Sequence, residues 1–337
     1  MHTVERVVGR LTGLSGPAVT EEMKGGASTR GFFRVRLLDS TCVAMHVPGE
    51  SQEIAKVLVN GRRWPFLEVR DLLAERGIRV PKVVHEACQE GVLLVEDLGD
   101  YTLANYLTEF PEQRERLYKN AVRDLAHAQK ALATLPADSI VRERAFDYDL
   151  LLWEVEHFRE WGLQARGIHL SHADNQVFDE AARYLARTVS SWPRGFVHRD
   201  YQSRNLMVTL AAGEPLLTWI DFQDALLGPR VYDLVALLTD SYQQFSRAFI
   251  ERRLDEYVEL RGFGPEERSS VGEEFDTTTV QRKLKDAGRF VFIDRVNKNP
   301  GFLHFVEPTI EKARAALSRL THHEELAKLA ALLERVL

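Results

Sequence analysis

The stretch FVHRDYQSRNLMVTLAAGEPLLTWIDFQD, residues 196–224, decides the fold. Short apolar runs alternate with a polar loop and a glycine-proline turn, which predicts strand, loop, strand, turn and strand. Polar residues stand at the ends of these strands. Asp200 and Asn205 are five residues apart, and Asp221 follows sixteen residues after Asn205, at the end of an apolar run. We therefore expect a polar site at the strand ends.

The spacing HRD-x-x-x-x-N, followed by a strand and an aspartate, is typical of loops that catalyse phosphoryl transfer. That reaction needs a carboxylate to orient the acceptor hydroxyl and take its proton, and oxygen ligands to hold Mg²⁺ against the phosphates. The pattern assigns the base to Asp200 and the metal ligands to Asn205 and Asp221. Asp and Asn are also common in turns, which explains one of the three easily and all three poorly.

The composition bounds the kind of protein. A chain of 337 residues with 45% apolar and 28% charged residues is globular and long enough for two packed units. A net charge of −6 argues against nucleic acid or an anionic membrane as the main partner. No run approaches the roughly 18 apolar residues of a membrane span, and the amphipathic N-terminus is unlike a signal peptide. Cys42 and Cys88 look like core thiols, so we expect a cytoplasmic protein.

A polar, glycine-rich loop lies between two expected strands in VTEEMKGGASTRGFFRVRLL. Small side chains let backbone amides approach a phosphate closely. The loop is neither a Walker A loop nor a GxGxxG loop, and a plain hairpin loop is the alternative. Its position ahead of the catalytic loop favours a phosphate cradle, whose residues would be Gly25, Gly26, Ala27, Ser28 and Thr29.

The next expected strand, TCVAMHV, departs from the general kinase pattern. It lacks the lysine that grips the nucleotide phosphates in protein kinases, and His46 stands about where that lysine would fall. We take His46 as a candidate nucleotide contact. Lys24 or Arg30 in the preceding loop could supply the missing positive charge instead.

A hinge is expected in VLLVEDLGD, an apolar strand that ends in an acidic, glycine-containing segment. Glu96 and Leu98 are our candidates for contacts to the adenine base at this hinge. The hinge separates a nucleotide-binding lobe, residues 1–98, from a catalytic and substrate-binding lobe, residues 99–337. Beyond the hinge, apolar residues recur at helical spacing, so the second lobe should be mostly helical.

Two features stay open on the residues alone. Asp233 lies near the start of a helix expected in GPRVYDLVALLTDSY, where it could cap the helix or brace the catalytic loop. A later basic stretch, balanced only by Asp286 and Asp294, could receive an anionic group or could be a solvated helix face. Its six basic residues are Arg282, Lys283, Lys285, Arg289, Arg295 and Lys298.

On these motifs the chain resembles the aminoglycoside phosphotransferase and choline kinase-like family of small-molecule kinases. Within that family it is most similar to the bacterial anomeric kinases of N-acetylmuramate and N-acetylglucosamine that serve cell-wall recycling. The similarity extends over residues 25–290. The matching stretches are GGASTRGFFRVR, VAMHVPGE, RVPKV, LLVEDLGD, HRDYQSRNLMV, IDFQDALLGPRVYDLVALLTDSY and QRKLKDAGRF.

The resemblance implies an α+β, bilobal protein kinase-like fold, with a small antiparallel β-rich N-lobe and a large, mostly helical C-lobe. It implies ATP and Mg²⁺ as cofactors, Asp200 as base and Asn205 and Asp221 as metal ligands. It also implies that a residue other than lysine at His46 is a feature of the sugar-kinase branch. The acceptor would be a small-molecule sugar.

Three functions are compatible with these features. The first is ATP-dependent phosphorylation of the anomeric hydroxyl of an N-acetyl amino sugar. The second is transfer to an aminoglycoside, choline or another metabolite hydroxyl, although the basic QRKLK stretch suits a polycation poorly. The third is a nucleotide-binding pseudokinase sensor, which only His46 supports, since Asp200, Asn205 and Asp221 are all present. We expect a monomer that binds neither nucleic acid nor membrane.

Overall fold

The computed structural model describes all of the chain except residues 1, 14–17, 24–29, 38–39 and 48–63. Contacts divide the chain into two compact units. The first comprises residues 1–103 and 206–223, and the second comprises residues 104–205 and 224–337. The phosphate loop expected at residues 25–29, and Lys24 beside it, lie outside the described residues. The lobe boundary after residue 98 stays a prediction.

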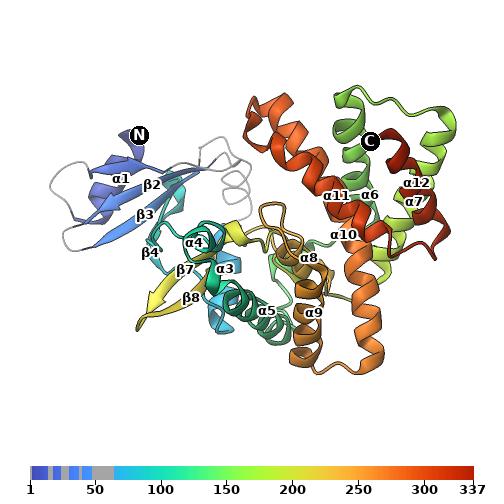
Figure 1. Cartoon of the computed structure of the whole chain (residues 1–337). Helices are drawn as coiled ribbons and strands as arrows, with labels where there is room; N and C mark the ends of the chain where they lie inside the picture. Colours follow the sequence, from blue (N-terminus) through green and yellow to red (C-terminus); the bar gives the residue numbers. More distant parts are fainter. Residues whose placement is uncertain (1, 14–17, 24–29, 38–39, 48–63) are drawn as a thin grey trace. The chain divides into compact units, whose positions relative to one another are not determined.

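The first unit is built around a five-stranded antiparallel sheet (Figure 1). Successive side chains of a strand point to opposite faces, so each strand contributes to two layers of core. Phe33 and Leu94 pack on one face with α1 (His2–Leu11). Met45 packs on the other face with α3 (Pro65–Glu75). The strands lie in the order β1 (Thr20–Glu22), β2 (Gly31–Arg36), β3 (Thr41–His46), β5 (Val92–Glu96) and β4 (Val83–Ala87).

The hairpin of β7 (Leu206–Ala211) and β8 (Glu214–Trp219) belongs to this first unit, although it lies far away in sequence. The Trp219 amide donates to the carbonyl of Arg79 at 2.9 Å, and the Arg79 guanidinium donates to the carbonyl of Leu217 at 2.8 Å. Both strands were predicted from the sequence and are confirmed. Their connection is a two-residue turn with φ of 52° at Ala212 and 82° at Gly213, which is the left-handed geometry that tight hairpins require.

The second unit is mostly helical, as predicted. Side-chain caps begin several of its helices: Asp147 accepts from the Leu150 amide, and Ser171 accepts from the Asp174 amide. Two short strands, β6 (Arg194–Val197) and β9 (Leu226–Pro229), flank the catalytic stretch. The helices are α4 (Leu103–Glu109), α5 (Arg114–Ala131), α6 (Tyr148–His157), α7 (His172–Ser191), α8 (Tyr232–Leu238), α9 (Arg247–Arg261), α10 (Pro265–Asn297), α11 (Val306–Leu317) and α12 (Glu324–Val336).

The long helix α10 is the centre of the second unit (Figure 1). It packs against α6, α7, α8, α9 and α11. Val280, Leu284, Ala287 and Val291 recur at spacings of three and four residues, so they form one apolar stripe that is buried among these helices. The other residues of α10 are therefore free to carry polar groups toward the catalytic loop.

The described residues also form shorter helical segments in both units. They are a π-helix at Phe158–Leu163 and 3₁₀ turns at Cys88–Glu90, Pro111–Gln113, Ile140–Glu143, Gln164–Arg166, Ser203–Asn205 and Pro300–Phe305.

We expect Gly288→Ala to destabilise the second unit. A Cβ at Gly288 would lie 2.9 Å from the carbonyl oxygen of His157 and 2.9 Å from the Cα of Phe158, and backbone cannot move aside as a flexible side chain can. Overpacking of this kind costs about 1–3 kcal/mol. Urea unfolding followed by circular dichroism measures the change. Gly195→Ala is the control because its Cβ would meet nothing within 4 Å. Equal stability of the two variants would contradict the prediction.

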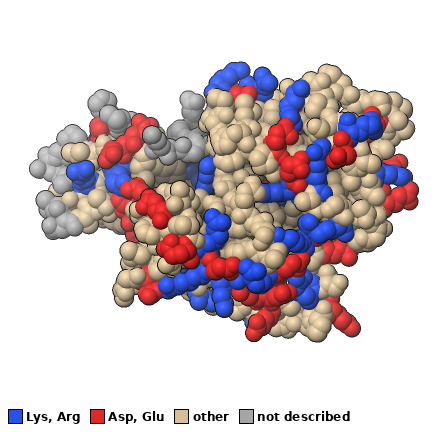
Figure 2. All heavy atoms as spheres, viewed as in Figure 1, with Lys and Arg blue, Asp and Glu red and all other residues tan. Residues whose placement is uncertain are grey.

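The surface of the second unit mixes both signs of charge. Acidic and basic side chains are interspersed over the visible face of its helices (Figure 2). Several of them form ion pairs, such as Arg252 with Glu115 at 2.7 Å and Arg335 with Asp174 at 2.6 Å. Within the described part of the chain, every helix is too short or too polar to cross a membrane.

Candidate active site

The candidate catalytic loop, residues 198–205, follows β6 and is held by Asp233 of α8. The Asp233 carboxylate accepts hydrogen bonds from the backbone amides of His198, at 2.7 Å, and Arg199, at 3.0 Å. Arg199 has a φ of 82°, an uncommon conformation for a residue with a side chain, and this double contact fixes it. Of the two roles predicted for Asp233, the loop brace is confirmed. The cap is wrong, because α8 begins after Val231 and has no side-chain cap.

A second brace comes from Asp240, which sequence reasoning missed. Its buried carboxylate accepts hydrogen bonds from the amide of Ser203, at 2.8 Å, and from the Ser203 hydroxyl. Lys312 of α11 in turn donates to the carbonyl of Asp240. The Tyr201 hydroxyl donates to the carbonyl of Ala121 at 2.9 Å, which ties the same loop to α5. No pattern in LLTDSY points to this role, since it depends on a contact across 37 residues.

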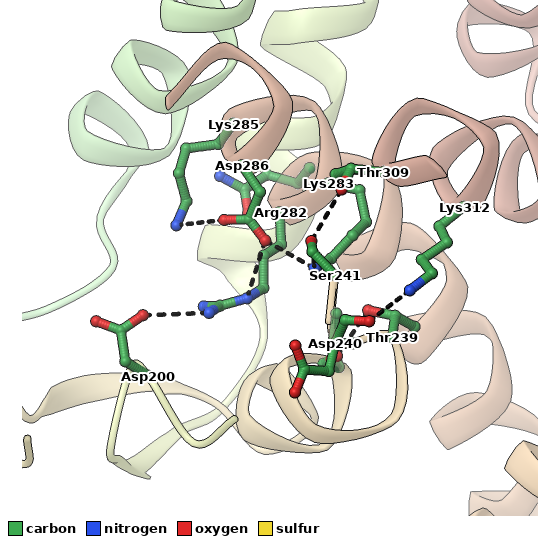
Figure 3. Close-up of polar contacts among 12 residues, drawn as sticks. Asp200, Thr239, Asp240, Ser241, Arg282, Lys283, Lys285, Asp286, Thr309 and Lys312 are labelled. Atoms are coloured by element: carbon green, nitrogen blue, oxygen red, sulfur yellow. Dashed lines mark hydrogen bonds and ion pairs between the residues drawn. The ribbon is translucent and has the colours of Figure 1, made fainter. Parts of the chain in front are cut away.

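The candidate base Asp200 is paired with Arg282 of α10 (Figure 3). Nη2 of Arg282 lies 3.2 Å from Oδ1 of Asp200, and Nη1 donates to the carbonyl of Arg199 at 2.7 Å. Burial by itself would raise the pKa of Asp200. The positive charges of Arg282, Lys285 and Arg199 outweigh that effect and lower the pKa below its ordinary value. Asp200 is therefore ionised at neutral pH and able to accept a proton.

Asp286 holds the basic residues of α10 in place. Its carboxylate lies 2.7 Å from Nζ of Lys283 and 2.9 Å from Nζ of Lys285, and Arg282 reaches past it toward Asp200 (Figure 3). Arg282 and Lys283 are each only 1% exposed. The alternative of a solvated helix face is therefore wrong for these two residues, because they are buried and pair with the carboxylates of Asp200 and Asp286. Arg289, Arg295 and Lys298, which lie further along α10 or at its end, are exposed, as the alternative of a solvated helix face predicts.

One candidate metal ligand directly precedes the β7–β8 hairpin in the sequence, and the other follows it. Asn205 directly precedes β7, whose first residue Leu206 pairs with Trp219, two residues before Asp221. Nδ2 of Asn205 donates to the carbonyl of Asp200 at 2.9 Å, so the structure brings these two candidates together. Asp221 has a φ of 63°, and its Oδ1 accepts from Gln223 at 2.8 Å. Carboxylate and amide oxygens are the donors that Mg²⁺ prefers, so this set fits the ion.

The candidate nucleotide contacts of the first unit lie at opposite ends of the β3–β5 ladder. His46 pairs with Val92, and Cys42 pairs with Glu96. Four residues of strand separate the two ends by about 13 Å. Burial lowers the pKa of His46, so this ring is neutral at neutral pH and does not replace the charge of the absent lysine. Leu98 follows β5 in the expected hinge.

Ion pairs and a backbone contact fix the course of the hinge. Arg34 of β2 binds Asp97 at 2.8 Å and Asp100 at 2.8 Å. The Lys82 amide donates to the Glu96 carboxylate at 3.1 Å. The side chain of Glu96 is therefore used within the protein, where it ties the hinge to the residue before β4. The Glu96 amide also donates to the carbonyl of Lys82 at 2.8 Å. The carbonyl of Glu96 and the backbone of Leu98 therefore stay the candidates for the predicted contact to a base.

We expect Asp233→Asn to lower kcat by roughly 10²-fold, because an amide can accept through one oxygen only and a loop displaced by about 1 Å costs that much. Burial raises the pKa of Asp233 to about 7, although the two amide hydrogen bonds and the charge of Arg282 each lower it. The wild-type rate should therefore fall below pH 7, as the brace takes a proton, and this limb should be absent in the variant. Rate measurements from pH 5 to 9 check both. An unchanged pH profile in the variant would contradict the assignment.

The sequence and the fold of this chain are similar to those of known phosphotransferases. The sequence model of the phosphotransferase enzyme family matches residues 20–270. The N-acetylmuramate/N-acetylglucosamine kinase of Pseudomonas aeruginosa is 30% identical over 94% of this chain and 88% of its own. Its namesake from Neisseria meningitidis serogroup B is 31% identical over 78% of this chain and 75% of its own. ADP-bound aminoglycoside phosphotransferase APH(2'')-Ib has the same fold, with a TM-score of 0.59 at 12% identity over 91% of this chain and 97% of its own.

These similarities confirm the predicted kinase-like fold and the family resemblance. The family match covers most of the first unit and the whole of the catalytic stretch. The candidate site residues Asp200, Asn205 and Asp221 all lie inside it. The protein is therefore a phosphotransferase with a hydroxyl acceptor and belongs to the phosphotransferase enzyme family.

Proposed function

We propose that the protein transfers the γ-phosphoryl group of ATP to the anomeric hydroxyl of N-acetylmuramate, N-acetylglucosamine or both. The observation that carries this proposal is the ionised Asp200, held by Arg282 in a loop that Asp233 and Asp240 brace. The names of the relatives that align over most of the chain supply the sugar. The reaction would belong to cytoplasmic recycling of cell-wall sugars, and we expect a monomer.

In this mechanism Asp200 orients the sugar hydroxyl and accepts its proton during transfer. Asn205 and Asp221 would hold Mg²⁺, which when bound supplies positive charge to the phosphates. The chain course supports that pairing, since both residues adjoin the same end of the β7–β8 hairpin. Arg282 keeps Asp200 ionised and oriented, so the base needs no reorganisation as the reaction proceeds.

The nucleotide would be bound by the first unit. Backbone groups at Glu96 and Leu98 would meet the adenine, His46 would lie near the phosphates, and residues 25–29 would cover them. The roughly 13 Å between the ends of the β3–β5 ladder leaves room for a nucleotide to extend from base to phosphates. The ADP bound to APH(2'')-Ib, which shares the fold, supports the use of a nucleotide.

A coupled ADP-release assay tests the proposal. Mg²⁺-ATP is offered with N-acetylmuramate, N-acetylglucosamine, kanamycin or choline, and phosphorus NMR identifies the product. An anomeric sugar phosphate is the expected result. Turnover with kanamycin or choline alone would move the acceptor to another class. Bound ATP without turnover on any acceptor would point to a nucleotide sensor. Light scattering of the same sample checks the expected monomer.

A further inference from the structure

Arg289 differs from the basic residues that shortly precede it on α10. Arg282, Lys283 and Lys285 are each paired with a carboxylate. Within the described residues no carboxylate lies within ion-pair distance of Arg289. Its guanidinium stands 4.7 Å over the ring of Phe292, also on α10. A guanidinium stacked in this way keeps its N–H groups directed outward in its own plane, where a planar anion can bind them.

The electrostatics place Arg289 in the neighbourhood of the base. Its own burial and the positive charge of Arg199 lower the pKa of Arg289, whereas Asp200 acts in the opposite direction. Arg289 also helps to lower the pKa of His157 to about 4, after the larger effect of burial. Arg289 thus lies within electrostatic range of Arg199, Asp200 and His157 together.

Helix geometry gives the direction in which Arg289 lies. It is seven residues after Arg282, so the two side chains leave the same face of α10 and start about 10 Å apart along its axis. Arg282 ends on Asp200, where the reacting hydroxyl would be. Arg289 would therefore stand beside an acceptor whose reacting hydroxyl is bound at Asp200, further along α10 from that hydroxyl.

A series of aromatic rings connects Arg289, through Phe292 and the buried His157, to Trp153. The ring of His157 lies 5.5 Å from that of Phe292 and 5.4 Å from that of Trp153. Trp153 is 58% exposed, unlike most large apolar residues of this unit. Aromatic rings with a few polar groups are the usual lining of small-molecule sites. The exposed Trp153 and a guanidinium without a carboxylate partner together suit a ligand with a ring and an anionic substituent.

We propose that Arg289 binds the carboxylate of an acidic N-acetyl amino sugar and so sets the preference between acidic and neutral acceptors. The inference rests on the proposed function. N-acetylmuramate carries a lactyl carboxylate on C3, two ring carbons from its anomeric carbon, whereas N-acetylglucosamine has a hydroxyl group there. With the anomeric hydroxyl at Asp200, the lactyl group extends along α10 toward Arg289. Arg199 adds positive charge on the loop side.

The test compares Arg289→Met with the wild type on both sugars. Methionine keeps a long side chain against Phe292 but removes the charge. The ratio of kcat/KM for N-acetylmuramate to that for N-acetylglucosamine should fall roughly 10- to 100-fold, the usual effect of losing a charged hydrogen bond. Arg289→Lys should lie between the two. Arg295→Met is the matched control, since Arg295 is exposed on the same helix and pairs with its neighbour Asp294.

Each outcome decides the matter. An equal loss on both sugars would assign Arg289 a structural role and overturn the inference, while leaving the proposed function intact. A raised KM for ATP alone would assign the guanidinium to a phosphate and would also overturn it. A wild-type enzyme that phosphorylates neither sugar but accepts kanamycin or choline would overturn the proposed function and the inference together.

Discussion

Asp200→Asn should reduce kcat by about 10²–10⁴-fold and leave the fold unchanged. Asparagine has the shape of aspartate, so the contact to Nη2 of Arg282 can persist through its oxygen. It cannot accept the proton of the sugar hydroxyl. Because the Asp200 side chain is 36% exposed and Arg282 also lies close to Asp286, loss of the charge should cost little stability. The ADP-release assay gives kcat, and a thermal melt gives stability.

The control for this variant is Asp138→Asn. Asp138 is exposed in the connection between α5 and α6, outside the catalytic loop, and its replacement removes the same charge from the protein. Its kcat should equal that of the wild type. If Asp200→Asn kept more than a tenth of the wild-type kcat with an unchanged KM for ATP, Asp200 would not be the base.

Arg282→Met should be the second most damaging substitution. It removes the donor to Asp200 and to the Arg199 carbonyl, both of which position the base. We expect kcat to fall roughly 10²-fold, as a misplaced catalytic group does. Hydrogen bonds from charged groups contribute about 1.5–3 kcal/mol each, so stability should fall by an amount on that order. Urea unfolding and kcat are the two measurements, and Arg295→Met on the same helix is the control.

The pH profile of Arg282→Met separates charge from position. The positive charge of Arg282 lowers the pKa of Asp200, and it also lowers the pKa of Asp233, which burial raises to about 7. Removing the charge lets both pKa values rise, so Asp233 takes a proton at a higher pH. The acid limb of kcat/KM, which Asp233 sets, should therefore move to higher pH relative to the wild type. A limb that stays in place while kcat falls would limit the role of Arg282 to positioning.

The local part of the site was predictable from the sequence. A catalytic loop is a short motif with fixed offsets, so Asp200 and Asn205 could be identified by spacing alone. The hairpin after it follows from the apolar alternation and the turn at Gly213. Asp233 could be predicted as a brace or a cap because it lies near the start of a helix. The choice between these roles needed the distances to the amides of His198 and Arg199.

The long-range part of the site was not predictable. Arg282 meets Asp200 across 82 residues, and Asp240 meets Ser203 across 37. The sequence of α10 shows basic residues but not which of them face the core, because its charged and apolar positions overlap in helical phase. Burial then changes the chemistry of the groups. Lys283 is held inside with a lowered pKa, whereas Arg289 remains at the surface.

The divided chain course of the first unit has a consequence for protein synthesis. Arg79 contacts Leu217 across 138 residues, so the sheet-bearing unit stays incomplete until the ribosome has made β8. By then α4 to α7 of the second unit have already been synthesised. Contacts that are this distant in sequence slow folding, and unfinished units expose apolar surface. The N-terminal segment of a nascent chain therefore cannot finish folding until the β7–β8 hairpin has been synthesised. A chain that ends before β7 cannot complete either unit.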